Sequence, residues 1–171
     1  MNELLGRMVR AAKLDPNLYE EVEADRDLLG QAMLVVVLSS IAAGLGNIAQ
    51  TGAGGIVLMA ILALVSWFIW AFLTYIIGTK LLPTSNTEAD YGQLLRTIGF
   101  SSSPGIIRIL GIVPGLAGIV FTAANIWMLV AMVIAVRQAL DYESTLRAVG
   151  VCLIGWLIQA VLLGLALAAL A

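Results

Sequence analysis

Charge and chemically reactive side chains are scarce in this chain of 171 residues. Only 12% of the residues are charged, histidine is absent, and Cys152 is the single cysteine. One cysteine excludes an internal disulfide, and the lack of histidine leaves no material for His/Cys metal sites or catalytic triads. No acid falls inside an apolar run, which excludes paired intramembrane carboxylates. We therefore expect a non-enzymatic protein with no cofactor or metal and no nucleic acid partner.

Apolar residues dominate instead, at 61% of the sequence with a mean hydropathy of +1.00. Several runs approach or exceed the ~18–20 residues that cross a bilayer. We expect an all-α, polytopic membrane protein with a bundle of five transmembrane helices. The first run follows seven acids within 28 residues, so we expect it to be an uncleaved span and not a signal peptide. The expected spans are 29–49, 55–78, 93–112, 114–136 and 149–170.

Residues 1–28 are expected to form two short cytoplasmic helices that precede the membrane domain, residues 29–171. Residues 2–13 place apolar side chains at helical spacing and Arg7, Arg10 and Lys13 on the other side. This basic amphipathic helix either lies on the membrane surface or packs on the bundle. Asp15 and Pro16 are typical of a helix start. The acidic helix expected at 16–28 is either a solvated face or a docking patch for a partner.

The third apolar segment, 93–113, either crosses the membrane or dips and returns. Five crossings with a cytoplasmic N-terminus place eight of the nine lysines and arginines inside, and only Arg108 elsewhere. A re-entrant segment would place seven of these nine residues inside and two outside. The positive-inside rule therefore favours five crossings, with the C-terminus outside.

Pro104 is expected to kink this third helix because it lacks the N–H that would bond residue 100. Gly105 adds flexibility, and the neighbouring serines can bond the freed carbonyls. Pro114 marks the expected start of the fourth span. Arg108 is expected to snorkel to the far interface, or to bond carbonyls or Asn125.

Two amides within the spans, Asn125 and Gln159, are expected to bond across helices. Small residues also recur at spacings that let helices approach closely, within the bundle or between copies of the chain. These residues are Ser40 and Gly44, Gly111 and Gly115, Ala131 and Ala135, and Ala160, Gly164 and Ala168.

Three stretches resemble the Yip (Ypt-interacting protein) domain family, particularly its prokaryotic members. They are LDPNLYEEVEADRDLLGQAMLVVVL (14–38), RTIGFSSSPGIIRILGIVPGLAGIVF (96–121) and NIWMLVAMVIAVRQALDYESTLRAV (125–149), within a resemblance over residues 14–165. The most specific part is the R-x-x-G-F-x-x-x-P-G core formed by Arg96, Gly99, Phe100, Pro104 and Gly105. The later Ile126-Trp127 pair and residues 137–140 are also typical.

The resemblance implies five transmembrane helices and a cytoplasmic N-terminus. Eukaryotic relatives bind prenylated Rab-type GTPases and shape transport membranes. Here Gln31 replaces the proline of their Asp-Leu-x-Gly-Pro entry to the first span, and their long N-terminal region is absent. These two departures argue against carrying small GTPase binding over to this chain.

The scarcity of reactive groups favours a membrane scaffold, assembly factor or accessory subunit in a prokaryotic plasma (inner) membrane. Its partners would be the lipid bilayer and other membrane proteins or further copies of the chain. The alternative is a small transporter or channel that uses the broken third helix and Arg108, because discontinuous helices often line substrate sites. A lipid-binding or bilayer-shaping role is a third possibility, based on residues 2–13.

Overall fold

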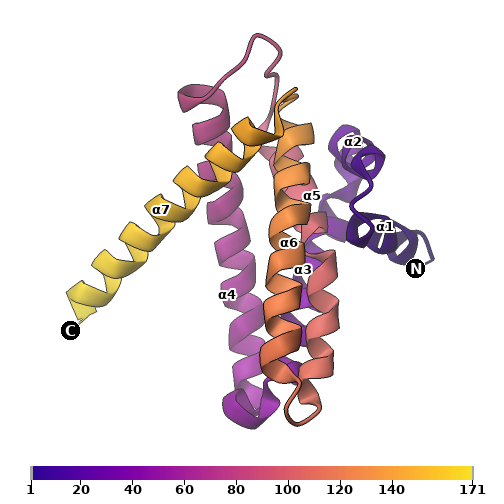
Figure 1. Cartoon of the computed structure of the whole chain (residues 1–171), viewed down its shortest axis with the longest axis vertical. Coiled ribbons are helices and arrows are strands. Elements are labelled where there is room, and N and C mark those ends of the chain that lie inside the picture. The colour runs from indigo at the N-terminus through magenta and orange to yellow at the C-terminus, as the bar shows by residue number, and fades with distance from the viewer. Residues whose placement is uncertain (1, 171) are drawn as a thin grey trace.

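The chain folds into a series of helices joined by short loops (Figure 1). The computed structural model describes residues 2–170, and the side chains at these positions except 51, 53 and 162–170. No strand occurs among the described residues, which confirms the all-α class. The helices are α1 (Asn2–Ala12), α2 (Pro16–Ala24), η1 (Arg26–Leu28), α3 (Leu29–Gly46), α4 (Ile48–Ile76), η2 (Ile77–Leu81), α5 (Tyr91–Ser101), η3 (Ser103–Ile112), α6 (Ala117–Ala139) and α7 (Thr145–Leu170).

Three helical segments are long and apolar enough to cross a membrane: Arg26–Gly46, Gly54–Leu81 and Ala117–Ala139. Thr145–Val161 is a shorter apolar helix. The chain is therefore an integral, multi-pass membrane protein. The expected start of the fourth span at Pro114 is wrong, because Pro114 lies in a loop. Gly115 has φ +85°, which a continuing α-helix does not allow, and α6 begins at Ala117.

The helices α3, α4 and α6 run side by side along the long axis, and α5 and η3 follow one another beside them (Figure 1). The N-terminal helices α1 and α2 lie on one flank of this bundle. On the other side α7 leaves the bundle at an angle, so that its far end lies well away from the other helices. The bundle thus has a packed body and one divergent helix.

The third apolar segment is not a kinked α-helix, as the sequence predicts, but an α-helix followed by a 3₁₀-helix. After α5 ends at Ser101, the Ser102 N–H bonds the Gly99 carbonyl at 3.1 Å and the Gly105 N–H bonds the Ser102 carbonyl at 3.0 Å. Pro104 has no N–H to continue the α-helical pattern, and the tighter pattern persists to Ile112. Helical rises give α5 about 16 Å and η3 about 20 Å of length.

Glycines bring η3 very close to α3. A Cβ added to Gly105 would lie 2.1 Å from the Ser39 Oγ, and one added to Gly46 would lie 1.9 Å from the Arg108 carbonyl oxygen. The contacts form a seam of Ala32, Ser39 and Gly46 on α3 and Gly99, Gly105 and Gly111 on α5 and η3. The spacing of seven residues is two α-helical turns, and the spacing of six is two 3₁₀ turns. The two helix types therefore stay in register along the seam.

The sequence predicts the start of α2 correctly and its end incorrectly. The Asp15 side chain accepts a hydrogen bond from the Asn17 N–H at 3.0 Å, and Pro16 is the first helical residue. Instead of continuing to residue 28, α2 ends at Ala24 because Asp25 adopts an extended conformation, with φ −94° and ψ 104°. The division of the chain at residue 28 stays a prediction.

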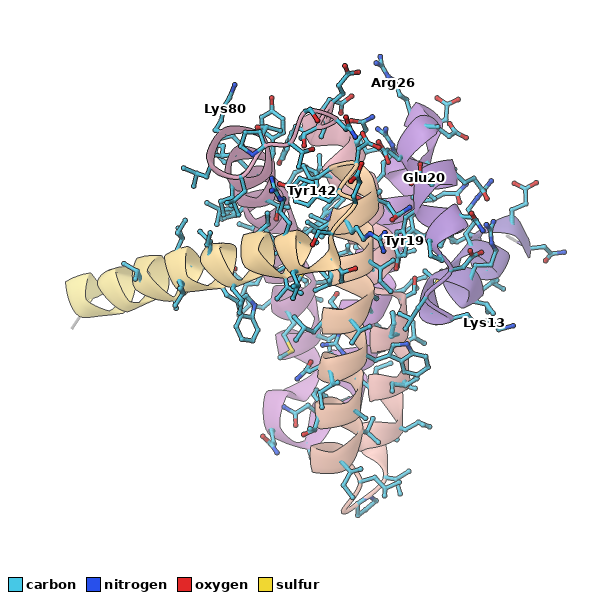
Figure 2. All side chains as sticks on the ribbon, turned by 45° about the horizontal axis from the view of Figure 1, so that its top comes forward. Lys13, Tyr19, Glu20, Arg26, Lys80 and Tyr142 are labelled. Atoms are coloured by element: carbon cyan, nitrogen blue, oxygen red, sulfur yellow. The ribbon has the colours of Figure 1, made fainter. Side chains whose placement is uncertain are left out.

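Charged side chains gather at one end of the bundle. Arg26, Glu20 and Lys80 lie at the end that comes forward in Figure 2. At the opposite end, the segments 46–56 and 109–118 contain no lysine, arginine, aspartate or glutamate. The bundle therefore has one charged end and one uncharged end.

Candidate functional site

The Arg108 side chain points into the bundle and not toward its uncharged end. Its carbonyl oxygen lies against Gly46, the last residue of α3, whereas its guanidinium reaches Ser39, two turns earlier in α3. Nη2 donates to the Ser39 Oγ at 2.8 Å and carbonyl at 3.2 Å, and Nε donates to the Gly105 carbonyl at 3.1 Å. Bonding to carbonyls was one expectation and is confirmed. Snorkelling is not what the structure shows.

No carboxylate among the described residues forms an ion pair with Arg108. The ion pairs found among the described residues all lie within the N-terminal helices and the loop between them. The partners of the Arg108 guanidinium are a hydroxyl and two carbonyls, and its Nη1 donates to no described residue. A half-buried positive charge in a bundle of apolar helices thus has only neutral partners.

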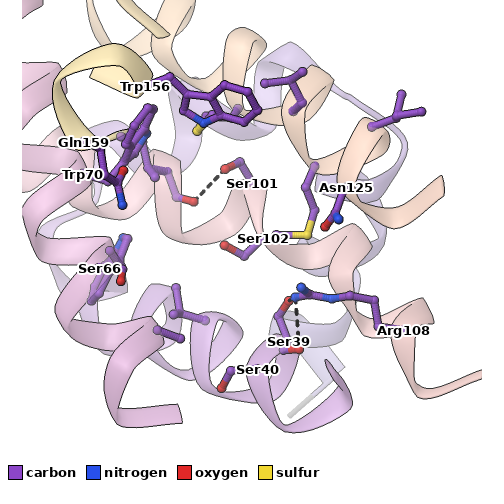
Figure 3. A pocket seen from close by; sticks show the side chains of 18 residues that line it. Ser39, Ser40, Ser66, Trp70, Ser101, Ser102, Arg108, Asn125, Trp156 and Gln159 are labelled. Atoms are coloured by element: carbon purple, nitrogen blue, oxygen red, sulfur yellow. Dashed lines mark hydrogen bonds between the residues drawn. The ribbon is translucent and has the colours of Figure 1, made fainter. Parts of the chain in front are cut away.

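Beside Arg108 lies a cavity of about 660 Å³, which we call the mid-span cavity (Figure 3). Helices α3, α4, α6 and α7 and the junction of α5 with η3 all contribute to its wall. Its polar lining consists of Ser39, Ser40, Ser66, Ser101, Ser102, Arg108, Asn125 and Gln159. Its apolar lining includes Trp67, Trp70, Trp156, Met128 and Met132. The cavity combines hydrogen-bonding groups with large apolar walls.

Several polar groups of the mid-span cavity have no partner among the described residues. The Trp70 Nε1 is buried and donates to no residue that the structure describes, whereas the Trp67 Nε1 donates to the Leu95 carbonyl at 3.0 Å. Contrary to the expectation from the sequence that they bond across helices, the side-chain amides of Asn125 and Gln159 form no hydrogen bond in the described part of the chain. In Figure 3, Trp70 and Gln159 lie opposite Arg108 and Asn125 across the cavity.

The serines at the end of α5 behave as the sequence predicts. The Ser103 Oγ donates to the Phe100 carbonyl at 2.7 Å, and the Ser101 Oγ donates to the Ile98 carbonyl at 2.7 Å. Each bond satisfies a carbonyl close to the point where the α-helical pattern stops. Phe100 and Pro104 are buried in the body beside this break. The five defined residues of the core motif thus lie outside the lining of the cavity, whereas the intervening Ser101 and Ser102 belong to it.

Two other residues of the family motif hold the N-terminal helices. Arg96, only 4% exposed, donates from Nε to the Val22 carbonyl at 2.7 Å and from Nη2 to the Glu23 carbonyl, both at the end of α2. Trp127 donates from Nε1 to the Ala12 carbonyl at 2.8 Å, at the end of α1. Helix C-termini leave carbonyls without partners. Arg96 and Trp127 supply those partners and attach both helices to the bundle.

The basic residues of α1 face α2. The Arg7 Nε bonds Glu21 at 2.8 Å, and Arg10 bonds both Glu21 and, at 2.8 Å, Asp15. The hydrogen bonds from Arg7 and Arg10 hold the pKa of Glu21 below its usual range. The sequence allows two arrangements of this helix, on the membrane surface or packed on the bundle. In the structure α1 packs on the protein through these arginines.

Glu23 is a buried acid at the end of α2. Its side chain is 9% exposed, and its Oε2 has no hydrogen-bond partner. Burial, together with the negative charges of Asp141 and Glu20, raises the pKa of Glu23 to about 7, although the charge of Arg96 acts in the opposite direction. Because this acid lies outside the spans, its protonation can respond to the pH of the adjoining solution.

The structure divides the candidate residues of the sequence among four places. Arg108, Asn125 and Gln159 line the mid-span cavity. Gly99, Phe100, Pro104 and Gly105 form the body at and beside the seam, Arg96 and Trp127 hold the N-terminal helices, and Pro114 lies in a loop. Among the described residues, no group of three or more acids, histidines or cysteines could hold a metal ion.

No motif in the sequence groups Ser39, Ser66, Trp70 and Trp156 with these residues. The serines stand out only as polar residues within apolar runs, and the tryptophans are equally typical of interfacial anchors. They come from three helices, and only Ser66 and Trp70 share one, α4, where a spacing of four residues places them on the same face. Only the packing of four helices and one helix junction brings them to one cavity.

The fold defines an all-helical, multi-pass membrane protein with a small N-terminal helical unit docked on its bundle. The Yip1 domain model matches residues 14–168, so the chain belongs to the Yip1 domain family. The match confirms the resemblance carried by residues 14–165. No curated protein and no solved structure matches the chain.

Proposed function

We propose that the chain crosses a prokaryotic plasma membrane five times, with the N-terminus in the cytoplasm and the C-terminus outside. The concentration of charge at one end of the bundle supports this orientation. The lengths of α5 and η3 together exceed the ~30 Å hydrocarbon layer, which supports a complete third crossing.

Single cysteines in a variant that lacks Cys152 test this topology. A cysteine at Ser144, between α6 and α7, should be labelled only after permeabilisation, and one at Gln50, at the uncharged end, should be labelled from outside. A third at Ala171, which lies outside the described residues, should also react from outside. Labelling of Ser144 in intact cells would contradict five crossings in this orientation.

We further propose that the protein is a non-enzymatic scaffold or assembly factor that engages another membrane protein through α7. One observation carries this proposal: α7 diverges from the bundle and leaves large apolar side chains uncovered. Leu157 is 68% exposed and Val161 is 60% exposed. On the opposite face, Gly155 packs against Trp70 and holds the first half of α7 on the bundle. An angled helix of this kind offers a surface for a helix of a partner.

Photo-crosslinking in the native membrane tests this surface. A photoreactive amino acid at Leu157 should give a discrete protein adduct. The matched control is Leu62 on α4, which is 54% exposed but lies on a helix of the bundle body and should contact only lipid. An adduct of twice the mass of the chain would identify self-association. If Leu157 and Val161 gave no adduct beyond that of Leu62, the α7 scaffold proposal would be wrong.

A small transporter or channel is the second candidate, and the mid-span cavity favours it. The 3₁₀ segment and Arg108 at its wall resemble the broken helices that line substrate sites in transporters. Flux of a small anion into liposomes that contain the purified protein tests this role. Flux that requires Arg108 would support it, and the absence of any protein-dependent flux would leave the scaffold proposal alone.

A further inference from the structure

Two donors in the wall of the mid-span cavity lack an acceptor among the described residues. Within the described part of the chain, no carboxylate pairs with the positive charge of Arg108, and its Nη1 forms no hydrogen bond. The Trp70 side chain is 7% exposed, lines the cavity and leaves its buried Nε1 without a partner. A guanidinium and an indole N–H can only donate. The missing component of the site is therefore a group that accepts hydrogen bonds and carries negative charge.

The hydrocarbon layer of the bilayer contains no such group at this depth. Asn125 lies in the central part of α6 and Ser66 in the central part of α4, where a bilayer contains hydrocarbon. A polar group that lacks a partner in hydrocarbon strongly destabilises the folded protein. Because four helices direct such groups to the same space, the arrangement is expensive unless a ligand occupies it.

The remaining residues of the cavity wall favour a ligand with a large apolar part. Trp67, Trp156, Met128 and Met132 provide broad apolar surfaces, and Met adapts to irregular shapes. The volume of about 660 Å³ lies within the range of ordinary small-molecule sites. Trp156, which is 59% exposed, and Ser66 also lie on the open side of the cavity. A ligand can thus enter from the surrounding bilayer.

We propose that the mid-span cavity binds one anionic amphiphile. Its carboxylate or phosphate accepts hydrogen bonds from Arg108, and its apolar chain lies against the tryptophans and methionines. The hydrogen bonds from the Arg108 Nη2 to Ser39 hold the guanidinium in place, and its Nη1 remains free to bind the ligand. This inference does not depend on the scaffold role, and it differs from transport because binding alone is required.

Native mass spectrometry of the full chain in a non-ionic detergent tests the proposal. The probes are palmitate, phosphatidylglycerol and palmityl alcohol, which shares the chain of palmitate but has no charge. We expect one equivalent of an anionic probe to bind and the alcohol to bind at least about tenfold more weakly. Preference for palmitate would identify a carboxylate ligand, and preference for phosphatidylglycerol would identify a phospholipid. Equal binding of palmitate and the alcohol would overturn the proposal.

Charge-removing variants locate the site. Arg108→Gln should weaken binding of the anionic probe at least about tenfold, whereas Arg26→Gln, which removes an exposed charge at the charged end, should leave it unchanged. Asn125→Leu alters only a side chain on the open side of the cavity. It should weaken the same probe several-fold while the protein stays folded, which provides a second reading if Arg108→Gln does not fold. Undiminished binding to Asn125→Leu and to a folded Arg108→Gln would place the amphiphile elsewhere.

Quenching of tryptophan fluorescence gives a reading that requires no change at Arg108. Three tryptophans line the mid-span cavity, whereas Trp127 binds the end of α1 outside it. A dibrominated fatty acid should quench fluorescence saturably, and palmitate should reverse the quenching. The same saturable quenching should be observed with the Trp127→Phe variant. Quenching that is lost in Trp127→Phe would show that the fatty acid binds outside the cavity.

Discussion

Replacing Glu23 with glutamine is expected to tighten the attachment of α2 to the bundle above neutral pH. Burial raises the pKa of Glu23 from its ordinary value of 4.5 to about 7, so the docked helix favours the protonated acid. Ionisation at higher pH places an unpaired carboxylate beside the negative charges of Asp141, Glu20 and Asp90, with only Arg96 to offset them. Glutamine keeps the shape of the protonated acid and cannot ionise.

The sign and the size of the effect follow from linkage. An acid whose pKa is raised in the docked state gives its full stability below pH 4.5 and loses it between pH 4.5 and 7. The difference between the two pKa values corresponds to about 3 kcal/mol. Water reaches part of the site and screens the charges, so we expect roughly 1–2 kcal/mol at pH 8.5, or about 5- to 30-fold in the opening equilibrium of α2.

Hydrogen exchange of the α2 backbone amides measures this equilibrium. Comparing wild type with Glu23→Gln at the same pH removes the intrinsic pH dependence of exchange. The ratio of protection should be close to one at pH 4.5 and should rise by the stated factor at pH 8.5. Glu88→Gln, which changes an exposed acid in the loop before α5, should give a ratio near one at both values. The same ratio for Glu23→Gln at both pH values would refute the reasoning.

Two substitutions test close contacts elsewhere. Gly46→Ala should destabilise the protein in detergent by about 1–3 kcal/mol, as measured by thermal unfolding with circular dichroism. The reason is that the new methyl group meets the Arg108 carbonyl, and this backbone group cannot move away. The control is Gly30→Ala, where no atom lies within 4 Å of the new methyl group, and it should be neutral or slightly stabilising. Tyr142→Phe should cost about 1–3 kcal/mol in the same assay, because its hydroxyl binds two carbonyls at and after the π-helical turn η2, at 3.1 and 2.7 Å.

The sequence predicts the helices well because each depends on local patterns. Apolar length defines α3, α4 and α6, and the Asp15-Pro16 pair defines the start of α2. The 3₁₀ form of η3 depends on a distant partner. Proline explains why the α-helix stops at this point, but the close approach to α3 through Gly46 and Gly105 involves residues some 60 positions apart. No local pattern contains that contact.

The direction of Arg108 shows the same dependence on tertiary structure. A cation near the end of an apolar span is ordinarily expected to reach for the nearest interface, because desolvation is costly. Here the 3₁₀ helix leaves the Gly105 carbonyl within reach, and the glycine seam brings the Ser39 hydroxyl and carbonyl close enough to bind the same guanidinium. Three neutral acceptors thus hold the charge inside the bundle. The glycines that permit close packing and the arginine that faces the mid-span cavity therefore form one arrangement, and the family motif around Pro104 is the element that creates it.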